Sequence, residues 1–386
     1  MSAGAVRVGV VGLGWMGQVH ARAYGRVRQH YLDTPLVPEL VAVADNAGDA
    51  RLDRAVQAYG FADVHADWRE LVERDDIDAV SITGPTFIHR DVAVAAARTG
   101  KHIWVEKPAG RHAGETAEIA AAVVAAGVQS AAGFNYRNAP AVELARELVA
   151  AGRLGRIEQV RIRMLADYAA DPEGALTWRY QNDYSGSGVL GDLVSHGVDL
   201  GRYVVGEVTE LVSDTAVFIP QRRRQSGAAF AHTARGTGEL ALVENEDYAS
   251  ALLRFAGGAC GTLESSRVAV GEQCTYGIEV HGDAGALSWD FRRMGELQVC
   301  SGAATSDASY ETRFVAPGQG ELGAFQPGSG ISMSYDDLKV IEAHRFICSI
   351  AEGVPQGATI VDAVRAAEVV DAMALSARER RWVTLS

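Results

Sequence analysis

The sequence predicts a doubly wound parallel α/β Rossmann domain, followed by an α+β domain with a large, mostly antiparallel sheet. Three observations lead to this fold class. A glycine-rich turn lies between a strand and a helix near the N-terminus, and apolar strands then alternate with helices as far as residue 134. From Ile157 onward, strand-like segments follow one another through Gly-rich turns with few helices between them. We therefore expect one domain over residues 1–133 and a second over residues 134–386.

The turn Gly12-Leu13-Gly14-Trp15-Met16-Gly17 follows the apolar segment 6–11 and opens a helical pattern. This strand–turn–helix context is the one that the dinucleotide-binding fingerprint requires. Gly12 permits the tight turn, Gly14 lets the backbone approach a pyrophosphate, and Gly17 lets the helix lie close to the strand. Because N–H groups at the start of the helix face the phosphate charge, we expect this turn, with Trp15 and Met16, to bind a dinucleotide. A glycine-rich turn without a ligand is the alternative.

The second strand is expected at residues 39–44, after an exposed excursion over residues 28–38 in which two prolines rule out a continuous helix. Asp45 follows this strand. An acidic residue there accepts hydrogen bonds from the adenosine ribose hydroxyls and repels a 2′-phosphate. Asp45 thus favours NAD, and NADP stays an alternative because Arg51 lies further along the next helix. The other interpretation of Asp45 is as the cap of a helix that starts near Ala47.

The alternation of strands and helices continues through the first domain. Helices are expected at residues 50–59, 68–73, 88–99 and 115–126, and strands at 79–82, 102–105 and 128–134. The carboxyl ends of parallel strands share one edge of the sheet, where ligands bind. That edge is predicted to carry Gly12, Asp45, Thr83, Gly84, Pro85, Thr86, Glu106, Lys107 and Asn135.

Lys107 directly follows the buried strand at residues 102–105. A lysine in that position is held at the ligand-binding edge of the sheet. Pro108 biases the Lys107 backbone toward an extended conformation. We expect a functional lysine here; the alternative is a solvated lysine paired with Glu106.

The second domain is predicted to be built mainly of strands. They are expected at residues 157–166, 208–218, 247–255, 259–268, 276–280, 286–290 and 297–300. One helix interrupts them at residues 188–200, and its Asp192, His196, Asp199 and Tyr203 form a polar stripe. A carboxylate one turn from a histidine orients the imidazole for proton transfer, which makes Asp192 and His196 candidate catalytic residues. The alternative is a solvated helix face, above all for Asp199 and Tyr203.

The segment 219–246 reads as a long insertion. Its three consecutive arginines, Arg222–Arg224, are typical of a solvated or inter-subunit loop more often than of an anion site. Residues 301–332 are expected to be irregular, and helices are expected at 335–350 and 360–376.

Composition limits the class of protein. The chain has 386 residues, a formal net charge of −13 and four cysteines. The acidic balance argues against nucleic acid as a partner, and no apolar run is long enough to span a bilayer. The cysteines form no Cys-x-x-Cys pair, so we expect reduced thiols, no bound metal and a cytoplasmic protein.

Four motifs together resemble the Gfo/Idh/MocA oxidoreductases, the group of glucose–fructose oxidoreductase and inositol 2-dehydrogenase. The motifs are Gly12-x-Gly14-x-x-Gly17 followed by His20, Thr83-Gly84-Pro85-Thr86 with His89, Glu106-Lys107-Pro108, and Gly188-x-x-x-Asp192-x-x-x-His196. The resemblance covers essentially the whole chain. It implies that Lys107 and His196 are the catalytic pair, with Asp192 beside them, and that the open face of the second sheet forms homodimers or homotetramers. We expect this uncovered face to be apolar, and an apolar sheet face has to be buried against a partner.

The resemblance extends to further site residues. His89, Glu106, Asn135, Trp178 and Arg179 are candidates for contact with the cofactor. Tyr136 and Arg137 follow the last strand of the first domain and are candidates for binding substrate hydroxyls, together with Lys107, Asp192 and His196. A packing role is the alternative for each of five of these residues: Asn135, Tyr136, Arg137, Trp178 and Arg179.

We therefore expect an NAD-dependent dehydrogenase acting on a secondary hydroxyl of a sugar, glycoside, aminoglycoside-type sugar or cyclitol. His196 takes the hydroxyl proton, Lys107 stabilises the developing negative charge on that oxygen, and Asp192 orients the substrate or His196. One alternative is an NAD-dependent glycosidase that uses transient oxidation and elimination. The other is a non-catalytic NAD-binding sensor, which would need none of these three residues.

Overall fold

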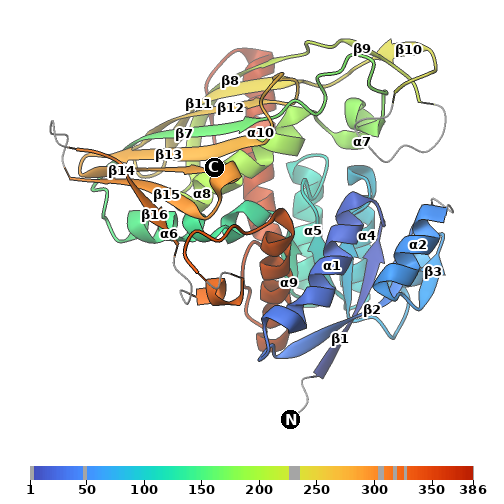
Figure 1. Cartoon of the computed structure of the whole chain (residues 1–386). Coiled ribbons are helices and arrows are strands. Elements are labelled where there is room, and N and C mark those ends of the chain that lie inside the picture. The colour runs from blue at the N-terminus through green and yellow to red at the C-terminus, as the bar shows by residue number, and fades with distance from the viewer. Residues whose placement is uncertain are drawn as a thin grey trace. The chain divides into compact units, whose positions relative to one another are not determined.

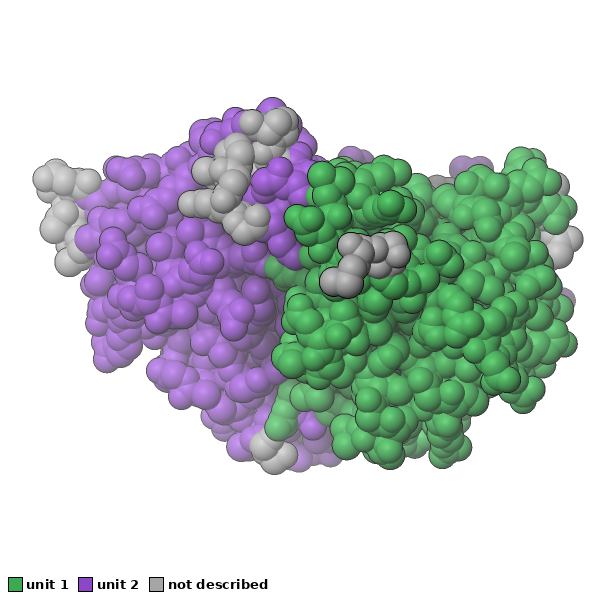
Figure 2. All heavy atoms as spheres, turned by 90° about the horizontal axis from the view of Figure 1, so that it is seen from below, with its two compact units in different colours: residues 1–135, 334–365 green, residues 136–333, 366–386 purple. Residues whose placement is uncertain are grey.

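A computed structural model describes residues 4–46, 50–225, 235–302, 308–315, 320–325 and 328–385. The chain divides into two compact units, coloured separately in Figure 2. The first contains Met1–Asn135 and Ser334–Arg365, and the second contains Tyr136–Met333 and Ala366–Ser386. This division differs from the expected one in that the segment Ser334–Arg365 belongs to the first unit.

Six parallel strands form the sheet of the first unit, in the order β3-β2-β1-β4-β5-β6. The strands are β1 (Gly4–Val11), β2 (Leu36–Ala44), β3 (Asp63–His65), β4 (Ala79–Ile82), β5 (His102–Val105) and β6 (Ser130–Ala132). The order reverses between β1 and β4, and ligands of such sheets bind outside the carboxyl ends of the strands at that point. The predicted doubly wound parallel sheet is confirmed.

Helices cover both faces of this sheet, because successive right-handed crossovers run in opposite directions from β1 and from β4. They are α1 (Trp15–His30), α2 (Ala50–Tyr59), α3 (Trp68–Val72), α4 (Thr86–Arg98), α5 (Ala113–Ala126) and α9 (Tyr335–Glu352), with the start of α10 (Ile360–Glu379). α1 packs against α9, and α4 packs against α5 (Figure 1). Residues from the far end of the sequence therefore complete one face of the first unit.

The expected excursion over residues 28–38 is much shorter than predicted. α1 continues to His30, and β2 begins at Leu36, so that Pro38 lies inside a strand. β3 pairs only with Ala42–Ala44 of β2. Pro38 thus has a described strand on one side only, where a proline is tolerated in a sheet.

Nine strands form the sheet of the second unit, in the order β16-β15-β14-β13-β7-β12-β11-β8-β17. The strands are β7 (Ile157–Leu165), β8 (Val208–Ala216), β11 (Tyr248–Phe255), β12 (Cys260–Ser266), β13 (Thr275–Gly282), β14 (Gly285–Asp290), β15 (Glu296–Ser301), β16 (Glu311–Phe314) and β17 (Val383–Thr384). Within this sheet, β7 and β12 run parallel and the other neighbours run antiparallel. The predicted mostly antiparallel sheet is confirmed.

One face of the nine-stranded sheet is covered by helices, among them α6 (Pro140–Ala150) and α8 (Ser195–Val204). Side chains of β7 alternate between buried and exposed, as expected for a sheet with one covered face. Two glycines let α8 lie close to this strand: a Cβ on Gly197 would be 2.9 Å from Met164, and one on Gly201 would be 2.7 Å from Ile162. The helix that carries His196 is therefore fixed tightly on the sheet.

The other face of this sheet is charged, and the expectation of an uncovered apolar face is wrong. Arg161 and Arg163 of β7 are exposed there, and both donate hydrogen bonds to Glu279 of β13, at 3.2 and 3.1 Å. A shallow hollow of about 610 Å³ lies over β7, β8, β11 and β12, with these arginines, Glu264 and Leu252 in its lining. Along these strands, buried apolar side chains alternate with exposed polar ones. The exposed face of the sheet is therefore polar, and not apolar as expected.

The insertion at 219–246 contains β9 (Gln221–Arg223) and β10 (Leu240–Leu242), while residues 226–234 lie outside the described ranges. Arg222 contradicts the expected solvated run, because its side chain is buried and donates to the backbone carbonyl oxygens of Asp171 and Ala169. Arg223 and Arg224 are exposed as expected.

The remaining short elements are α7 (Asn182–Ser185), η1 (Asn135–Asn138), η2 (Trp178–Tyr180), η3 (Leu190–Val194), η4 (Phe291–Arg293) and η5 (Gly320–Ala324).

In the described part of the chain, no helix combines the length and the apolar character needed to cross a membrane.

Candidate active site

The glycine-rich turn has the close approaches that its sequence predicts. Gly12 has a φ of +89°, and a Cβ on it would be 2.7 Å from the Gly84 backbone. A Cβ on Gly17 would be 2.0 Å from the Gly12 carbonyl oxygen, which also accepts a 2.6 Å hydrogen bond from the Thr83 hydroxyl. By contrast, nothing lies within 4 Å of the position of a Cβ on Gly14. Gly14 is the N-cap of α1, so this open space adjoins N–H groups that suit a pyrophosphate.

Asp45 is linked directly to this turn. Its Oδ2 accepts a 2.6 Å hydrogen bond from the Leu13 backbone N–H, so the carboxylate helps to hold the turn in place. α2 is described from Ala50 onward and residues 47–49 lie outside the described ranges, so the alternative in which Asp45 caps this helix stays a prediction. The carboxylate therefore stands beside the turn at the end of β2, where it fits the ribose of NAD and opposes a 2′-phosphate.

The loop after β4 is joined to the loop after β5 through His89. The two ring nitrogens of His89 lie 2.8 Å from the Gly84 carbonyl oxygen and 2.9 Å from that of Pro108. His89 is buried, and burial lowers its pKa more than these hydrogen bonds raise it. The structure thus gives His89 a role in joining two loops; direct contact of His89, Pro85 or Thr86 with the cofactor stays a prediction.

Asn135 is completely buried at the end of the first unit. Neither its side-chain oxygen nor its side-chain nitrogen has a hydrogen-bond partner among the described residues. A buried amide without partners is costly, and few such groups occur in native structures, so this one calls for a specific partner. A primary amide such as that of nicotinamide offers the matching donor and acceptor, so the residues present fit NAD at both ends of the cofactor.

Lys107 follows β5 and is half-buried, and the peptide bond that joins it to Pro108 is cis. Its backbone N–H lies 3.3 Å from Oε2 of the buried Glu106 carboxylate. Glu106 is therefore a structural support for Lys107, whereas its predicted contact with the cofactor stays a prediction.

In the second unit, Asp192 lies in a π-helical turn, η3, that continues into α8. π-helical turns occur often at functional sites. The start of this helix is capped by Glu246, whose Oε1 accepts hydrogen bonds from the N–H groups of Gly188 and Leu190 at 2.7 and 3.0 Å. A Cβ on Gly188 would be 2.2 Å from the Glu246 carbonyl oxygen, which explains the glycine at the start of the motif. Burial raises the pKa of Glu246, opposed by these hydrogen bonds and by Arg267.

Asp192 and His196 each contact an aromatic side chain of the second unit. The Tyr168 hydroxyl donates to Oδ2 of Asp192, and the pKa of Tyr168 is raised by burial and by the Asp192 charge. The His196 ring packs on Tyr136, with ring centroids 4.5 Å apart, and Tyr136 in turn contacts Tyr276. His196 is buried, so it is not part of a solvated helix face.

Asp199 and Tyr203 are not solvated in the way that the alternative interpretation required. Asp199 is buried in a bidentate ion pair with Arg137. The Arg137 guanidinium lies 4.8 Å from the centroid of the Tyr203 ring. Contact of Arg137 or Tyr136 with substrate stays a prediction.

Trp178 and Arg179 lie in η2 of the second unit, and the Arg179 guanidinium stacks over the Trp178 ring at 4.4 Å. Their predicted role beside the cofactor stays a prediction. Within the described ranges, no group of three or more His, Cys, Asp or Glu side chains is arranged to hold a metal ion.

Three supporting residues were not found from the sequence: Tyr168 behind Asp192, Glu246 at the helix start, and Lys339 beside Glu106. Each is far in sequence from the residue that it contacts. No local spacing or composition marks them, so only the fold reveals them.

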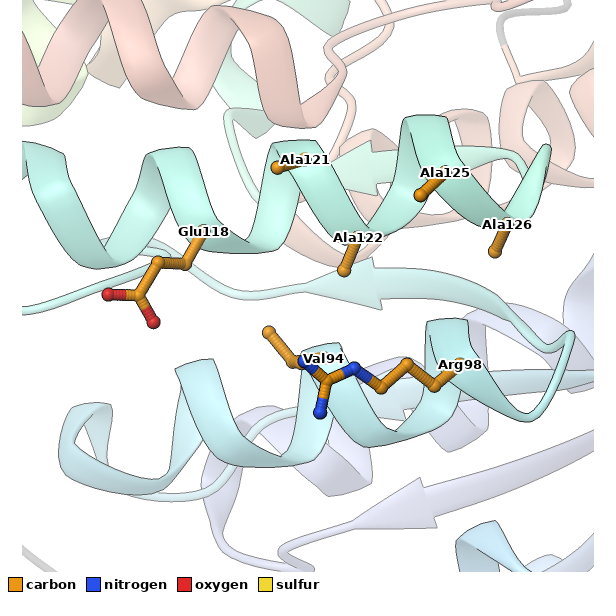
Figure 3. A pocket seen from close by; sticks show the side chains of 7 residues that line it. All are labelled: Val94, Arg98, Glu118, Ala121, Ala122, Ala125 and Ala126. Atoms are coloured by element: carbon orange, nitrogen blue, oxygen red, sulfur yellow. The ribbon is translucent and has the colours of Figure 1, made fainter.

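A surface groove of about 560 Å³ lies in the first unit between α4 and α5. Figure 3 shows Val94 and Arg98 of α4 across it from Glu118 and the alanines of α5. Its lining includes none of the predicted site residues.

Two family models match the chain. A model described as "Oxidoreductase family, NAD-binding Rossmann fold" matches residues 6–134. A second, described as "GFO/IDH/MocA C-terminal domain", matches residues 142–288. The two matches together cover well over half of the chain.

Known proteins are similar over almost the full length. Levoglucosan dehydrogenase of Pseudarthrobacter phenanthrenivorans is 35% identical over 381 residues, which are 98% of this chain and 97% of that protein. Inositol 2-dehydrogenase of Rhizobium meliloti is 27% identical, with 99% of each chain covered.

Among solved structures, levoglucosan dehydrogenase in complex with NADH and levoglucosan is similar with a TM-score of 0.91 and 33% identity, covering 98% of this chain and 99% of that one. An oxidoreductase domain protein from Kribbella flavida has a TM-score of 0.91 and 31% identity, covering 99% and 100%.

Proposed function

The chain belongs to the GFO/IDH/MocA oxidoreductase family, and on that basis we propose that it is an NAD-dependent dehydrogenase that oxidises a secondary hydroxyl of a sugar or cyclitol. The observation that carries the proposal furthest is the 35% identity to levoglucosan dehydrogenase over 98% of this chain. Levoglucosan is an anhydrosugar with secondary hydroxyls, so it is the first substrate to test. Inositols are the second class, because inositol 2-dehydrogenase is also similar over the full length.

The cofactor choice is supported by two features of the first unit. The open space at Gly14 adjoins the start of α1, and the Asp45 carboxylate stands beside the turn. The buried Asn135 amide offers a donor and an acceptor to the carboxamide of nicotinamide. NAD is therefore the expected cofactor, and its bound oxidised form supplies the acceptor for a hydride.

The proposed reaction removes two hydrogens from the secondary alcohol, one from the carbon as a hydride to NAD⁺ and one from the oxygen as a proton. The hydride leaves from the carbon, and the hydroxyl proton passes to the His196 imidazole as the C=O bond forms. The Lys107 ammonium stabilises the negative charge that develops on the same oxygen. Asp192, held by the Tyr168 hydroxyl, orients the substrate or His196. In the reverse direction the same groups protonate a ketone.

The test is steady-state turnover of the purified full chain with NAD⁺, followed by NADH absorbance. Substrates are levoglucosan, L-sorbose, myo-inositol, scyllo-inositol, free aldoses and a glycoside. Stoichiometric NADH formation with a polyol is expected. Cleavage of the glycoside without NADH accumulation would instead identify a glycosidase, and binding of NAD without turnover of any compound would favour a sensor.

We also propose that copies of the chain associate through the charged open face of the nine-stranded sheet, as a homodimer or homotetramer. Arg161, Arg163 and Glu279 supply groups of both signs there, so that face is suited to polar contacts with a copy of itself. We place the protein in the cytoplasm, because its four cysteines are all free thiols.

A further inference from the structure

The Glu106 carboxylate is held by side chains from two helices of the first unit. His20 Nε2 on α1 lies 3.0 Å from Glu106 Oε1, and Lys339 Nζ on α9 lies 2.5 Å from the same oxygen. None of these three side chains is more than 7% exposed. Glu106 and Lys339 are 233 positions apart, so only the return of Ser334–Arg365 to this unit makes their contact.

Lys339 also links Glu106 to a second carboxylate and to β5. Its Nζ lies 3.3 Å from Oε2 of Glu342, one turn further along α9. Oε1 of Glu342 accepts a 2.7 Å hydrogen bond from Nε1 of Trp104, and the Lys339 ammonium lies 5.4 Å from the centroid of the Trp104 ring. α9 therefore contacts the end of β5 at two places, residues 104 and 106.

The charges in this cluster depend mainly on Lys339. Burial lowers the pKa of His20 to about 4, so His20 is neutral near pH 7. The neutral ring donates from Nε2 to Glu106, while Nδ1 lies 3.3 Å from the Ser81 hydroxyl. Burial acts to raise the pKa of Glu106, but attraction to Lys339 and the His20 hydrogen bond bring it below its ordinary value. Without Lys339, a buried carboxylate would remain uncompensated.

The Glu106 carboxylate in turn restricts Lys107. The Lys107 backbone N–H lies 3.3 Å from Oε2, the second oxygen of the same carboxylate. Gly133, just after β6, packs against the same carboxylate, since a Cβ on Gly133 would be 2.5 Å from Glu106 Oε2. The position of the Lys107 backbone is thus set by groups on α1 and α9 and by the residue that follows β6.

We propose that Lys339 and Glu342 are positioning residues for the reaction: they fix the Glu106 carboxylate and Trp104, and through them the backbone from which Lys107 acts. The proposal rests on the proposed function of Lys107. It adds that the geometry of this catalytic group is set by a helix from the far end of the chain.

The main test is the variant Lys339→Met, compared with wild type in kcat, in KM for NAD⁺ and in hydrogen exchange of the segment 103–110. We expect kcat to fall roughly 10- to 100-fold, as for a misplaced catalytic group, with KM for NAD⁺ within about twofold. Exchange in the segment 103–110 should become faster. Lys339→Arg, which keeps the charge and the donors, should recover part of kcat.

Lys101→Met is the matched control. Lys101 is also buried and also adjoins β5, but it lies before the strand, and its ammonium contacts the Thr99 hydroxyl at 3.4 Å. Loss of this buried lysine should leave kcat and the exchange of the segment 103–110 close to wild type. A folded Lys339→Met with wild-type kcat and wild-type exchange would overturn the proposal.

Two provisions keep the outcome decisive. If Lys339→Met does not fold, the variant Glu342→Ala takes its place in the test. This substitution removes the acceptor of the Trp104 N–H and keeps the ion pair between Glu106 and Lys339. It should lower kcat several-fold and speed exchange at 103–110, and the absence of both effects would refute the inference. If wild type turns over no sugar or cyclitol, the proposed function fails, whereas the hydrogen-exchange comparison still decides whether α9 positions Lys107.

Discussion

At the scale of single residues, Asp45 combines two tasks at the end of β2. Its Oδ2 accepts the Leu13 N–H at 2.6 Å, which holds the glycine-rich turn, and its charge stands where the adenosine ribose is expected. Substitutions that separate the hydrogen bond from the charge can therefore distinguish turn geometry from cofactor choice.

Asp45→Asn keeps an oxygen acceptor for Leu13 and removes the charge. We expect its preference for NAD over NADP to narrow by about tenfold or more, because a charged hydrogen bond is lost for NAD and a repulsion is lost for NADP. Dissociation constants from calorimetry measure the preference. Asp45→Ala should in addition weaken binding of both cofactors, since the Leu13 N–H loses its acceptor. Tighter binding of NADP than of NAD by wild type would show that Asp45 has been misinterpreted.

Lys107 and His196 are expected to act on the chemical step and not on cofactor affinity. Lys107→Ala and His196→Ala should each reduce kcat by roughly 10²–10⁴-fold, the range for loss of a general base or of an oxyanion partner. The dissociation constant of NAD⁺ should change little, because we expect Gly12, Gly14 and Asp45 to hold the adenosine half. The double variant should lose less than the product of the two effects, since both groups are proposed to act on one oxygen. A His196→Ala enzyme that keeps most of its turnover would mean that Lys107 handles the proton without it.

These residues also show what local sequence can predict. Gly12, Lys107, Asp192 and His196 could be proposed as site residues because a motif places them directly after a strand or along one helix. Tyr168, Glu246 and Lys339 support them from 24 to 233 positions away, and no periodicity encodes such contacts. Burial of Asp199 was missed for the same reason, since its partner Arg137 is on another element.

At the scale of elements, strand positions were well predicted because buried parallel strands are short apolar runs between turns. β4 and β5 have the predicted bounds. Residues 28–38 were misjudged because a proline normally argues against a strand. Pro38 is tolerated in β2 because β3 pairs only with Ala42–Ala44, further along that strand. The charged open face of the nine-stranded sheet was misjudged. Alternation of side-chain types along a strand shows that the two faces of a sheet differ, but it does not show which partner the open face contacts.

Gly188 should be essential for the helix that carries Asp192 and His196. A Cβ in Gly188→Ala would be 2.2 Å from the Glu246 carbonyl oxygen, which would displace the cap from the helix start. We expect a lower melting temperature and a reduced kcat. Gly25→Ala is the matched control, because Gly25 lies in α1 with nothing within 4 Å of its added Cβ, and it should stabilise by roughly 0.5–1 kcal/mol. A Gly188→Ala protein as stable and active as wild type would contradict the close packing.

α9 should make stability depend on pH through Glu342. The pKa of Glu342 is raised to about 7, first by burial and also by repulsion from Glu106, against the attraction of Lys339. Below the ordinary value of 4.5 both folded and unfolded chains hold this proton. From there to about pH 7 the folded chain retains a proton that the unfolded chain has lost, so the free energy of unfolding falls as pH rises.

Glu342→Gln should remove this part of the pH dependence. Relative to wild type, the variant should gain stability from pH 5 to pH 8, by at most roughly 3 kcal/mol, because one pKa unit corresponds to about 1.4 kcal/mol. Denaturant titrations at several pH values measure the difference. If the free energy of unfolding depended on pH in the same way for both proteins, Glu342 would have to be ionised in the folded state across this range.

At the scale of the whole molecule, the charged face of the nine-stranded sheet determines how association should respond to salt. A polar interface is weakened by screening, whereas an apolar one is not. We expect light scattering to show a dimer or tetramer at low ionic strength, with dissociation favoured at high salt. Arg163→Glu, which places like charges beside Glu279, should favour the monomer. A wild-type monomer at micromolar concentration would rule out the proposed association.

The return of Ser334–Arg365 to the first unit has a consequence for synthesis on the ribosome. A nascent chain that has just completed β6 has every strand of the six-stranded sheet, yet it lacks α9 to cover α1 and the cation for Glu106. Until about two hundred further residues have been translated, Glu106 lacks the cation that compensates its charge in the folded unit. Domains commonly fold in order from the N-terminus during translation. Here the first unit lacks part of its own packing until α9 has been translated, so we expect its full stability only after most of the second unit has been made.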